Sequence, residues 1–253
     1  MIKRFWLAAA FSVLSFNALP QETEEAQEEQ MQAILQNTTR LQRELAAAAT
    51  LAAIPTEDLE AQTQNILANT ALLEETIAAG KRASIFCMNC HGESGMSVSD
   101  EVPNLSGQNA AYLFEQSRKF ATGERKDAFM EGLIKVLTNE EILQIAVFYS
   151  QSKVQYKPAD PAKEQARTRG KKRYNLLCQR CHGAHGMGDG LDNDLFDAKI
   201  ARISGQPVTY LVKTLKRYRD KTGERLNTLM LASTQTLSDR DVDDLAEYIN
   251  QLR

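Results

Sequence analysis

The sequence predicts an all-α chain in which two similar domains follow an acidic helical extension. Three observations lead to this prediction. A motif of two cysteines and one histidine occurs twice, many residues around it recur in the same order, and the segment before the repeats combines acidic residues with leucines at helical spacing. The predicted bounds are residues 1–20 for a signal segment, 21–78 for the extension, and 79–155 and 156–253 for the two domains.

The first twenty residues are typical of a secretory signal. Lys3 and Arg4 precede an apolar run over residues 5–16, and the tripeptide Ala-Leu-Pro at residues 18–20 ends it. The run is short for a membrane span, which needs about 20 residues. Because Phe16 stands where a small residue favours cleavage, an uncleaved segment that anchors the protein in a membrane stays an alternative.

The acidic extension differs in composition from the rest of the chain. Residues 21–80 carry eleven acidic side chains against two arginines, a net charge of −9. Leucines and isoleucines recur near helical spacing over residues 41–54 and again over 59–77. Since Pro55 favours the start of a new helix, we expect two amphipathic helices in a hairpin after a frayed leader rich in Glu and Gln. The extension either packs on the first domain or docks the protein to a partner.

The repeated motif contains every cysteine of the chain and two of its three histidines, as Cys87-Met88-Asn89-Cys90-His91 and Cys178-Gln179-Arg180-Cys181-His182. C-x-x-C-H is the attachment signature of c-type haem. On a helical turn, residues i and i+3 share a face, so both sulfurs reach one macrocycle while the histidine points at the metal. A redox-active cysteine pair, half of a zinc site or ordinary disulfides are the alternatives, and a zinc site leaves the histidine after each pair unexplained.

Alignment of the two motifs aligns much more of the chain. The matched pairs are Gly92 and Gly183, Gly95 and Gly186, Ser106-Gly107-Gln108 and Ser204-Gly205-Gln206, Tyr112-Leu113 and Tyr210-Leu211, and the Thr-Gly-Glu-Arg segments that end at Arg125 and Arg225. Five residues after each of these arginines stands a methionine, Met130 or Met230, on a stretch expected to be irregular. The chain is therefore a duplicated domain, whose copies are joined by a linker over residues 152–163.

Each copy is expected to contain three helices. An opening helix leads into the motif, a middle helix covers residues 112–121 or 210–219, and a closing helix covers residues 139–151 or 239–252. Met96 and Met187 follow the motif histidines by only five residues, so we expect them to pack rather than to ligate. His185 is expected to be a solvent-facing loop residue.

Both copies resemble class I cytochromes c, and the tandem resembles the dihaem cytochrome c4 family over residues 79–253. The resemblance implies two tandem cytochrome c domains with two covalently bound haem c groups, attached through Cys87 and Cys90 and through Cys178 and Cys181. It implies iron ligation by His91 with Met130 and by His182 with Met230. It also implies a hydrogen bond from His91 to the Pro103 carbonyl, where the second copy has Ala201. Arg125 and Arg225 either pair with haem propionates or are solvated surface residues.

Two six-coordinate irons leave no open site for a substrate, so the resemblance favours an electron carrier over an enzyme such as a dihaem peroxidase. The main hypothesis is a periplasmic carrier that takes electrons from a quinol-oxidising complex to a terminal oxidase. The alternative is the electron-accepting subunit of a periplasmic dehydrogenase. Membrane association would come through the uncleaved signal or a partner complex. Five basic residues between Lys213 and Lys221 could steer an acidic redox partner, and nothing in the balanced charge favours nucleic acid.

Overall fold

The computed structural model describes residues 26, 28–39, 42, 56–190, 200–223, 225 and 227–253. The chain divides into two compact units, residues 1–43 and 44–253. The predicted signal at residues 1–20 and the predicted helix over 41–54 lie outside the described residues, except for residue 42. None of the described helices is both long and apolar enough to cross a membrane.

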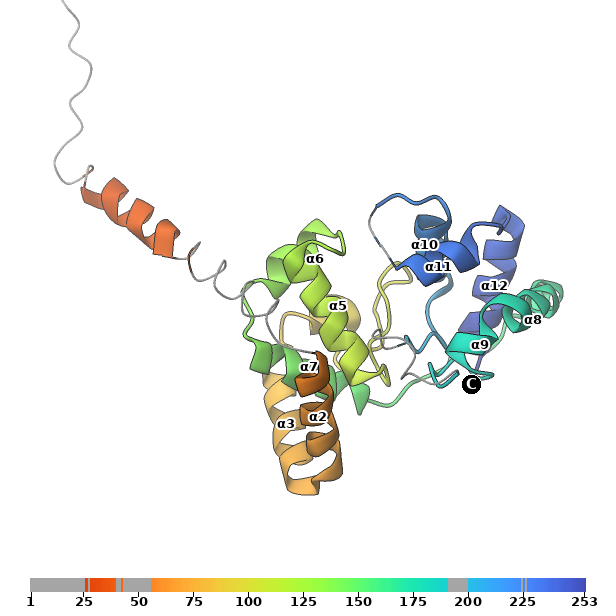
Figure 1. Ribbon diagram of the computed structural model, residues 1–253, viewed down its shortest axis with the longest axis horizontal. Coiled ribbons are helices and arrows are strands. Elements are labelled where there is room, and N and C mark those ends of the chain that lie inside the picture. Colours follow the sequence, from red (N-terminus) through yellow and green to blue (C-terminus); the bar gives the residue numbers. More distant parts are fainter. Residues whose placement is uncertain are drawn as a thin grey trace, which may run out of the picture. The chain divides into compact units, whose positions relative to one another are not determined.

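The predicted all-α class is confirmed, since the described residues contain helices and no strand (Figure 1). The first repeat and the segment before it hold α2 (Thr56–Ala68), α3 (Thr70–Ala83), α4 (Met88–His91), α5 (Ala110–Thr122), α6 (Ala128–Ile134) and α7 (Asn139–Ser150). The second repeat holds the 3₁₀ turn η1 (Pro161–Lys163), α8 (Glu164–Leu177), α9 (Gln179–His182), α10 (Val208–Arg219), α11 (Thr228–Thr234) and α12 (Asp239–Gln251). The middle and closing helices match the predicted ranges to within two residues.

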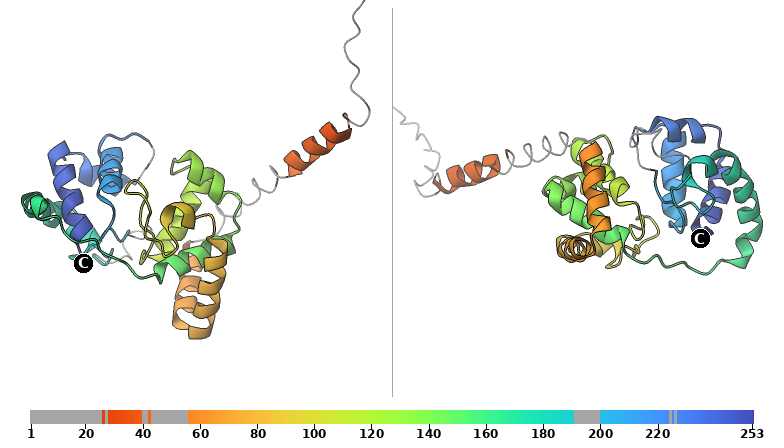
Figure 2. Two further views of the ribbon diagram at one scale, coloured as in Figure 1. Left: turned by 180° about the vertical axis from the view of Figure 1, so that it is seen from behind. Right: turned by 60° about the horizontal axis from the view of Figure 1, so that its bottom comes forward.

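Each repeat is built on a crossing of its opening and closing helices (Figures 1 and 2). In the first repeat α3 packs on α7, and in the second α8 packs on α12. A glycine lies at each crossing. A Cβ on Gly80 would overlap the carbonyl oxygen of Gln144, and a Cβ on Gly170 would overlap the carbonyl oxygen of Asp244. Glycine allows the two backbones to approach closely, which larger residues would prevent.

This crossing favours a different boundary between the extension and the first domain. Residue 79 lies inside α3, and α3 plays the same part in the first repeat as α8 plays in the second. The hydrophobic pattern over residues 59–77 was predicted as one helix, but Asn69 divides it: its side chain accepts a hydrogen bond from Leu72 N (3.2 Å) and caps α3. We propose that the first domain begins at Thr70.

The closing helices begin with the same capping box. Thr138 and Glu141 form it at α7, and Ser238 and Asp241 form it at α12. In each box the hydroxyl accepts from the backbone three residues later, and that residue's carboxylate accepts from the backbone of the capping residue. The boxes fix where each closing helix starts, and hence the register of the helix crossing.

Each repeat has its own hydrophobic core. The first contains Phe114, Phe120, Ile134, Ile142 and Val147, and the second contains Leu211, Leu215, Val242, Leu245 and Ile249 among their buried members. Helix α2 joins the first core through Ile66, which is 9% exposed. The part of the extension next to the first domain therefore packs on it.

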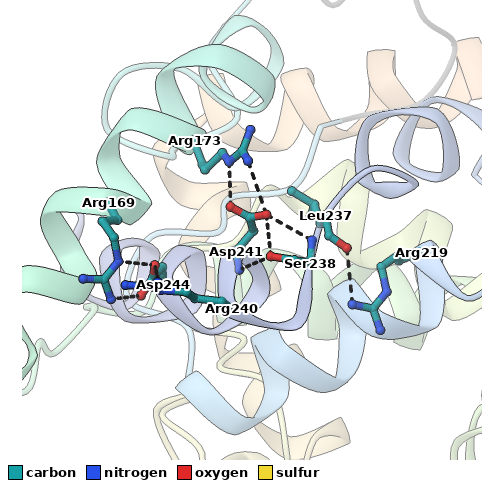
Figure 3. A network of polar contacts seen from close by, with 8 residues as sticks. All are labelled: Arg169, Arg173, Arg219, Leu237, Ser238, Arg240, Asp241 and Asp244. Atoms are coloured by element: carbon teal, nitrogen blue, oxygen red, sulfur yellow. Dashed lines mark hydrogen bonds and ion pairs between the residues drawn. The ribbon is translucent and has the colours of Figure 1, made fainter.

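The second repeat also carries ion pairs across its helix crossing (Figure 3). Arg169 on α8 binds Asp244 on α12 through two contacts of 2.6 and 2.7 Å, and Arg173 binds Asp241 at 2.6 Å. The first repeat has Ala79 and Ala83 at the positions aligned with these arginines. The pairs are thus specific to the second domain.

The acidic leader contains a helix, which the prediction of a frayed segment missed. Residues 28–39 are helical, and each of them is exposed. Thr38 and Thr39 return hydrogen bonds to the carbonyls of Ile34 and Leu35 four residues earlier. Exposure of Met31, Ile34 and Leu35 leaves this helix with apolar side chains that no described residue of its unit covers.

Candidate functional site

Both motifs lie on short helical turns directly after the opening helices. The backbone N–H of His91 donates to Cys87 O and that of His182 donates to Cys178 O, each at 2.9 Å. The chain then leaves the turn through Gly92 (φ +78°) and Gly183 (φ +79°). A positive φ is readily adopted only by glycine, which explains why these matched glycines follow the histidines.

One cavity brings together every residue that the sequence singled out as a ligand or attachment site. Its lining includes Cys87, Cys90, His91, Pro103, Arg125 and Met130 from the first repeat, and Cys178, Cys181, His182, Ala201, Arg225 and Met230 from the second. Met96, Met187 and His185 are not part of this lining. The two sets of residues therefore face a common space within residues 44–253.

The motif histidines are oriented by backbone carbonyls. Nδ1 of His91 lies 2.9 Å from Pro103 O, and Nδ1 of His182 lies 2.9 Å from Ala201 O. Only a protonated Nδ1 can donate to a carbonyl, so this arrangement assigns the proton to Nδ1 and leaves Nε2 free to bind a metal. Burial lowers the pKa of both imidazoles, which favours the neutral form that ligates metals.

The matched methionines lie on short helices, not on the irregular stretch that the sequence predicted. Met130 is on α6 and Met230 is on α11, and both side chains are partly buried. Asp127 and Asn227 cap these helices, and each accepts a hydrogen bond from the backbone N–H of its methionine at 3.1 and 3.0 Å. The Asp or Asn three residues before each methionine is a capping signal in the sequence from which these short helices could have been predicted.

The two methionines and the histidine that were not expected to ligate a metal lie outside the cavity lining. The Met96 sulfur accepts a contact from Gln155 N at 3.5 Å, and the Met187 sulfur accepts one from the Ser204 hydroxyl at 3.6 Å. His185 is exposed, and its Nδ1 lies 2.6 Å from the carbonyl oxygen of Arg253. This geometry keeps all three away from the cavity.

Two arginines and several tyrosines form a positive cluster in the cavity wall. Arg225 is only 6% exposed, and it donates to the hydroxyls of Tyr210 (2.9 Å) and Tyr218 (3.3 Å). Arg125 donates to Gln116 Oε1 at 3.0 Å and lies over the Phe120 ring, 4.3 Å from its centroid. Arg225 is therefore not a solvated surface residue.

The charge of this cluster has no acidic counterpart among the described residues, where neither Arg125 nor Arg225 forms an ion pair with a carboxylate. Burial alone would raise the pKa of Tyr210, but Arg225 and Arg125 lower it to about 8. A buried cation needs an anionic partner to offset its desolvation. The carboxylates of a haem fit this position.

The residues present thus fit a haem in each repeat. Each half of the cavity offers two thiols on one helical turn, an oriented imidazole, a methionine on a separate helix and a guanidinium, which is half-buried for Arg125 and buried for Arg225. The four cysteines are free of disulfides. The described residues contain no cluster of three or more His, Cys, Asp or Glu side chains that could hold a metal ion.

Comparisons with known proteins agree with this geometry. The family model for cytochrome c matches residues 168–253. Cytochrome c4 of Pseudomonas aeruginosa is 30% identical over 182 residues, which cover 69% of this chain and 88% of that protein. The thiosulfate dehydrogenase electron acceptor of Thiomonas intermedia is 29% identical, over 68% of this chain and 81% of that protein. The crystal structure of reduced cytochrome c4 from Pseudomonas stutzeri superimposes with a TM-score of 0.60 at 28% identity, covering 70% of this chain and 98% of that one.

Proposed function

Because this chain belongs to the cytochrome c4 family of dihaem electron-transfer cytochromes, with two covalently bound haem c groups, we propose that it is a periplasmic carrier that passes single electrons between respiratory redox proteins. The signal-like sequence of residues 1–20 supports export. A quinol-oxidising complex as the donor and a terminal oxidase as the acceptor are part of the proposal.

The observation that carries the proposal is the saturated ligand set of each half of the cavity. His91 with Met130, and His182 with Met230, would fill the ligand positions that each iron leaves to the protein, and the cysteines of each motif would hold the porphyrins. With both positions filled by side chains of the protein, no position is left for a substrate. The chain would therefore act as a carrier and not as an enzyme.

Each haem, when bound, would accept and release one electron at its iron. The protein residues keep that centre unchanged in both states. The Pro103 and Ala201 carbonyls hold the imidazoles in one orientation, the capped helices α6 and α11 hold the methionines, and the buried walls exclude water. Fixed ligands and a packed shell reduce the rearrangement that accompanies electron transfer.

Replacement of Met130 or Met230 by alanine is expected to open one iron in each single variant. Carbon monoxide should then bind rapidly to about half of the ferrous haem, while the unsubstituted protein should bind none on the same timescale, because an open coordination position is required. Stopped-flow absorbance of the dithionite-reduced protein measures this. Two haems per chain, counted as the pyridine haemochrome, must be retained.

The chain supplies its own matched controls for that experiment. Met96→Ala and Met187→Ala change the other repeated methionine pair, which lies outside the cavity lining, so neither should bind carbon monoxide. Rapid binding by the unsubstituted protein would contradict the carrier proposal and favour an enzyme. Unchanged spectra in Met130→Ala and Met230→Ala would remove these residues as ligands.

A second candidate function is an electron-accepting subunit of a periplasmic dehydrogenase. The thiosulfate dehydrogenase electron acceptors of Thiomonas intermedia (29% identical) and Stutzerimonas stutzeri (28% identical) favour it. In this role the acidic extension would bind the large catalytic chain, and the protein should co-purify with it from the native periplasm. A carrier that meets its partners only transiently should purify alone.

Truncation of the extension separates the two candidates, provided that the folded domain is left intact. Deletion of residues 21–55 keeps α2 and α3, so we expect two haems and unchanged stability. Deletion of residues 21–69 also removes Ile66 from the first core, and should lower the free energy of unfolding by about 2–3 kcal/mol. Unchanged reduction of the shorter deletion by cell extract supports the carrier, and loss of reduction supports the dehydrogenase subunit.

A further inference from the structure

The repeated tripeptide Ser-Gly-Gln places one glutamine of each repeat on the backbone of the other. Gln206 Oε1 accepts from Asn104 N at 2.9 Å, and Gln206 Nε2 donates to Asn104 O at 2.8 Å. In the equivalent contact from the first repeat to the second, Gln108 Oε1 accepts from Arg202 N at 2.7 Å and Gln108 Nε2 donates to Arg202 O at 2.8 Å. Both glutamines are 5% exposed.

The two backbone amides that the glutamines hold belong to the peptide groups that orient the motif histidines. The N–H of Asn104 and the carbonyl of Pro103 are two ends of one peptide group, and that carbonyl lies 2.9 Å from Nδ1 of His91. The N–H of Arg202 and the carbonyl of Ala201 form the equivalent group, 2.9 Å from Nδ1 of His182. Each histidine is thus linked through one planar amide to a glutamine of the other domain.

We propose that Gln206 tunes the haem ligated by His91 and that Gln108 tunes the haem ligated by His182, so that each domain sets the reduction potential of the other. The inference rests on the proposed histidine ligation. Both glutamines are positioning residues, because they act on the iron through the peptide group and the imidazole and touch neither the iron nor its ligands.

The direction of the effect follows from the polarity of the peptide group. When Gln206 accepts the Asn104 proton, the amide becomes more polarised and its carbonyl becomes a stronger acceptor for the His91 proton. A histidine that donates a stronger hydrogen bond is a more basic metal ligand. More basic ligation stabilises the oxidised iron, so the glutamine lowers the potential of the haem in the other domain.

The test measures both reduction potentials in Gln206→Leu and Gln108→Leu, with each potential assigned by the paramagnetic proton resonances of its haem during the titration. Gln206→Leu should raise the potential of the haem on His91 and leave the other within error. Gln108→Leu should give the reverse. The haemochrome of each variant must still give two haems per chain. A missing haem would indicate failure of the proposed haem binding itself, separately from failure of the cross-domain inference.

A control separates this effect from simple loosening of the interface between the repeats. Arg202→Lys keeps the charge but loses the guanidinium contacts to Gly107 O (3.5 Å) and the Tyr156 hydroxyl (2.7 Å), and leaves the Arg202 backbone in place. It should shift neither potential selectively. If a leucine variant fails to fold, Gln206→Glu and Gln108→Glu can be used, because they keep an acceptor at Oε1. Each should lower the reduction potential of the haem in the other domain more than that of the haem in its own domain.

The inference would be overturned if a glutamine substitution did not selectively shift the reduction potential of the haem in the opposite domain. Equal shifts at both haems, a larger shift at the haem of the substituted glutamine's own domain, or two unchanged potentials in the leucine variants would each show that the glutamines only hold the domains together.

Discussion

A chain in which Cys87 and Cys90 are both replaced by alanine is expected to carry one haem instead of two, with its first domain unfolded and its second intact. The two thiols are the only covalent attachment that the first half of the cavity offers, because every cysteine of the chain belongs to one of the two motifs. The matched variant Cys178→Ala with Cys181→Ala should retain the haem of the first domain.

The size of the effect follows from how much apolar wall faces the cavity. In the first repeat Phe120, Ile134 and Ile142 belong both to the core and to the lining. Without the porphyrin these side chains line a void, and in protein cores removal of even one large side chain costs about 2–5 kcal/mol. A small domain has little stability in reserve, so the loss of its largest apolar group should unfold it.

Covalent haem is measured by the haemochrome absorbance per chain and by peroxidase staining after denaturing electrophoresis, and folding is measured by far-ultraviolet circular dichroism. His185→Ala is the matched control, since this third histidine is exposed and outside the cavity. It should keep both haems. Retention of two haems by the double cysteine variant would disprove the attachment proposed for that motif.

The parts of this structure that could be predicted from the sequence are those where chemistry requires one residue type at one spacing. Thioether attachment of haem through C-x-x-C-H requires both cysteines, and the duplication showed which other residues recur at fixed positions after the motif. The start of the opening helix of the first domain is harder to predict, because α3 carries few residues identical to α8. The signal was present in Gly80 and Gly170, but a single glycine in a helical pattern has meaning only once its partner helix is known.

Alignment of the two repeats could not predict how their cores are packed. In the first repeat, Tyr149 on the closing helix lies beside Ser84 and Cys87, whereas in the second, Tyr174 on the opening helix lies beside Cys178. The aligned positions hold Ile249 and Tyr174 in place of Tyr149 and Ser84, and all four are at most 2% exposed. Each repeat buries one tyrosine near its first cysteine, but from opposite helices. The two aligned positions together hold one tyrosine and one smaller side chain in each repeat, so the buried volume is similar. Comparison of a single position does not show this compensation.

The short helices that carry Met130 and Met230 were missed for a different reason. Each has seven residues, too few to be stable alone or to show a clear hydrophobic period. Their caps and the packing of the rest of the domain determine them, so a window of sequence contains little evidence for them. The same dependence explains why the predicted ligand role of the methionines depends on their matched positions in the two repeats and on the resemblance to a family, and not on a predicted local structure.

Gly170→Ala is expected to destabilise the second domain by about 3 kcal/mol, although alanine is the better helix former. Away from contacts, the exchange in a helix favours alanine by up to about 1 kcal/mol. Here the new Cβ would overlap the backbone carbonyl of Asp244, which has no rotamer by which it could move away. The helices α8 and α12 must separate, and overpacking of this kind costs about 1–3 kcal/mol or more. Separation would also lengthen the contacts of Arg169 and Arg173 across the crossing (Figure 3).

Gly132→Ala provides the opposite expectation within the same chain. Gly132 lies on α6, and a Cβ built there meets no atom within 4 Å. The substitution should leave stability unchanged or raise it by about 0.5–1 kcal/mol. Guanidinium titrations followed by circular dichroism compare the two, together with Gly80→Ala, which should lower only the transition of the first domain. If all three substitutions left stability unchanged or raised it alike, helix propensity and not the close approach of the backbones would determine the effect of alanine at these positions. A selective loss in the two crossing variants would instead mean that the duplicated fold depends on two contacts between main chains.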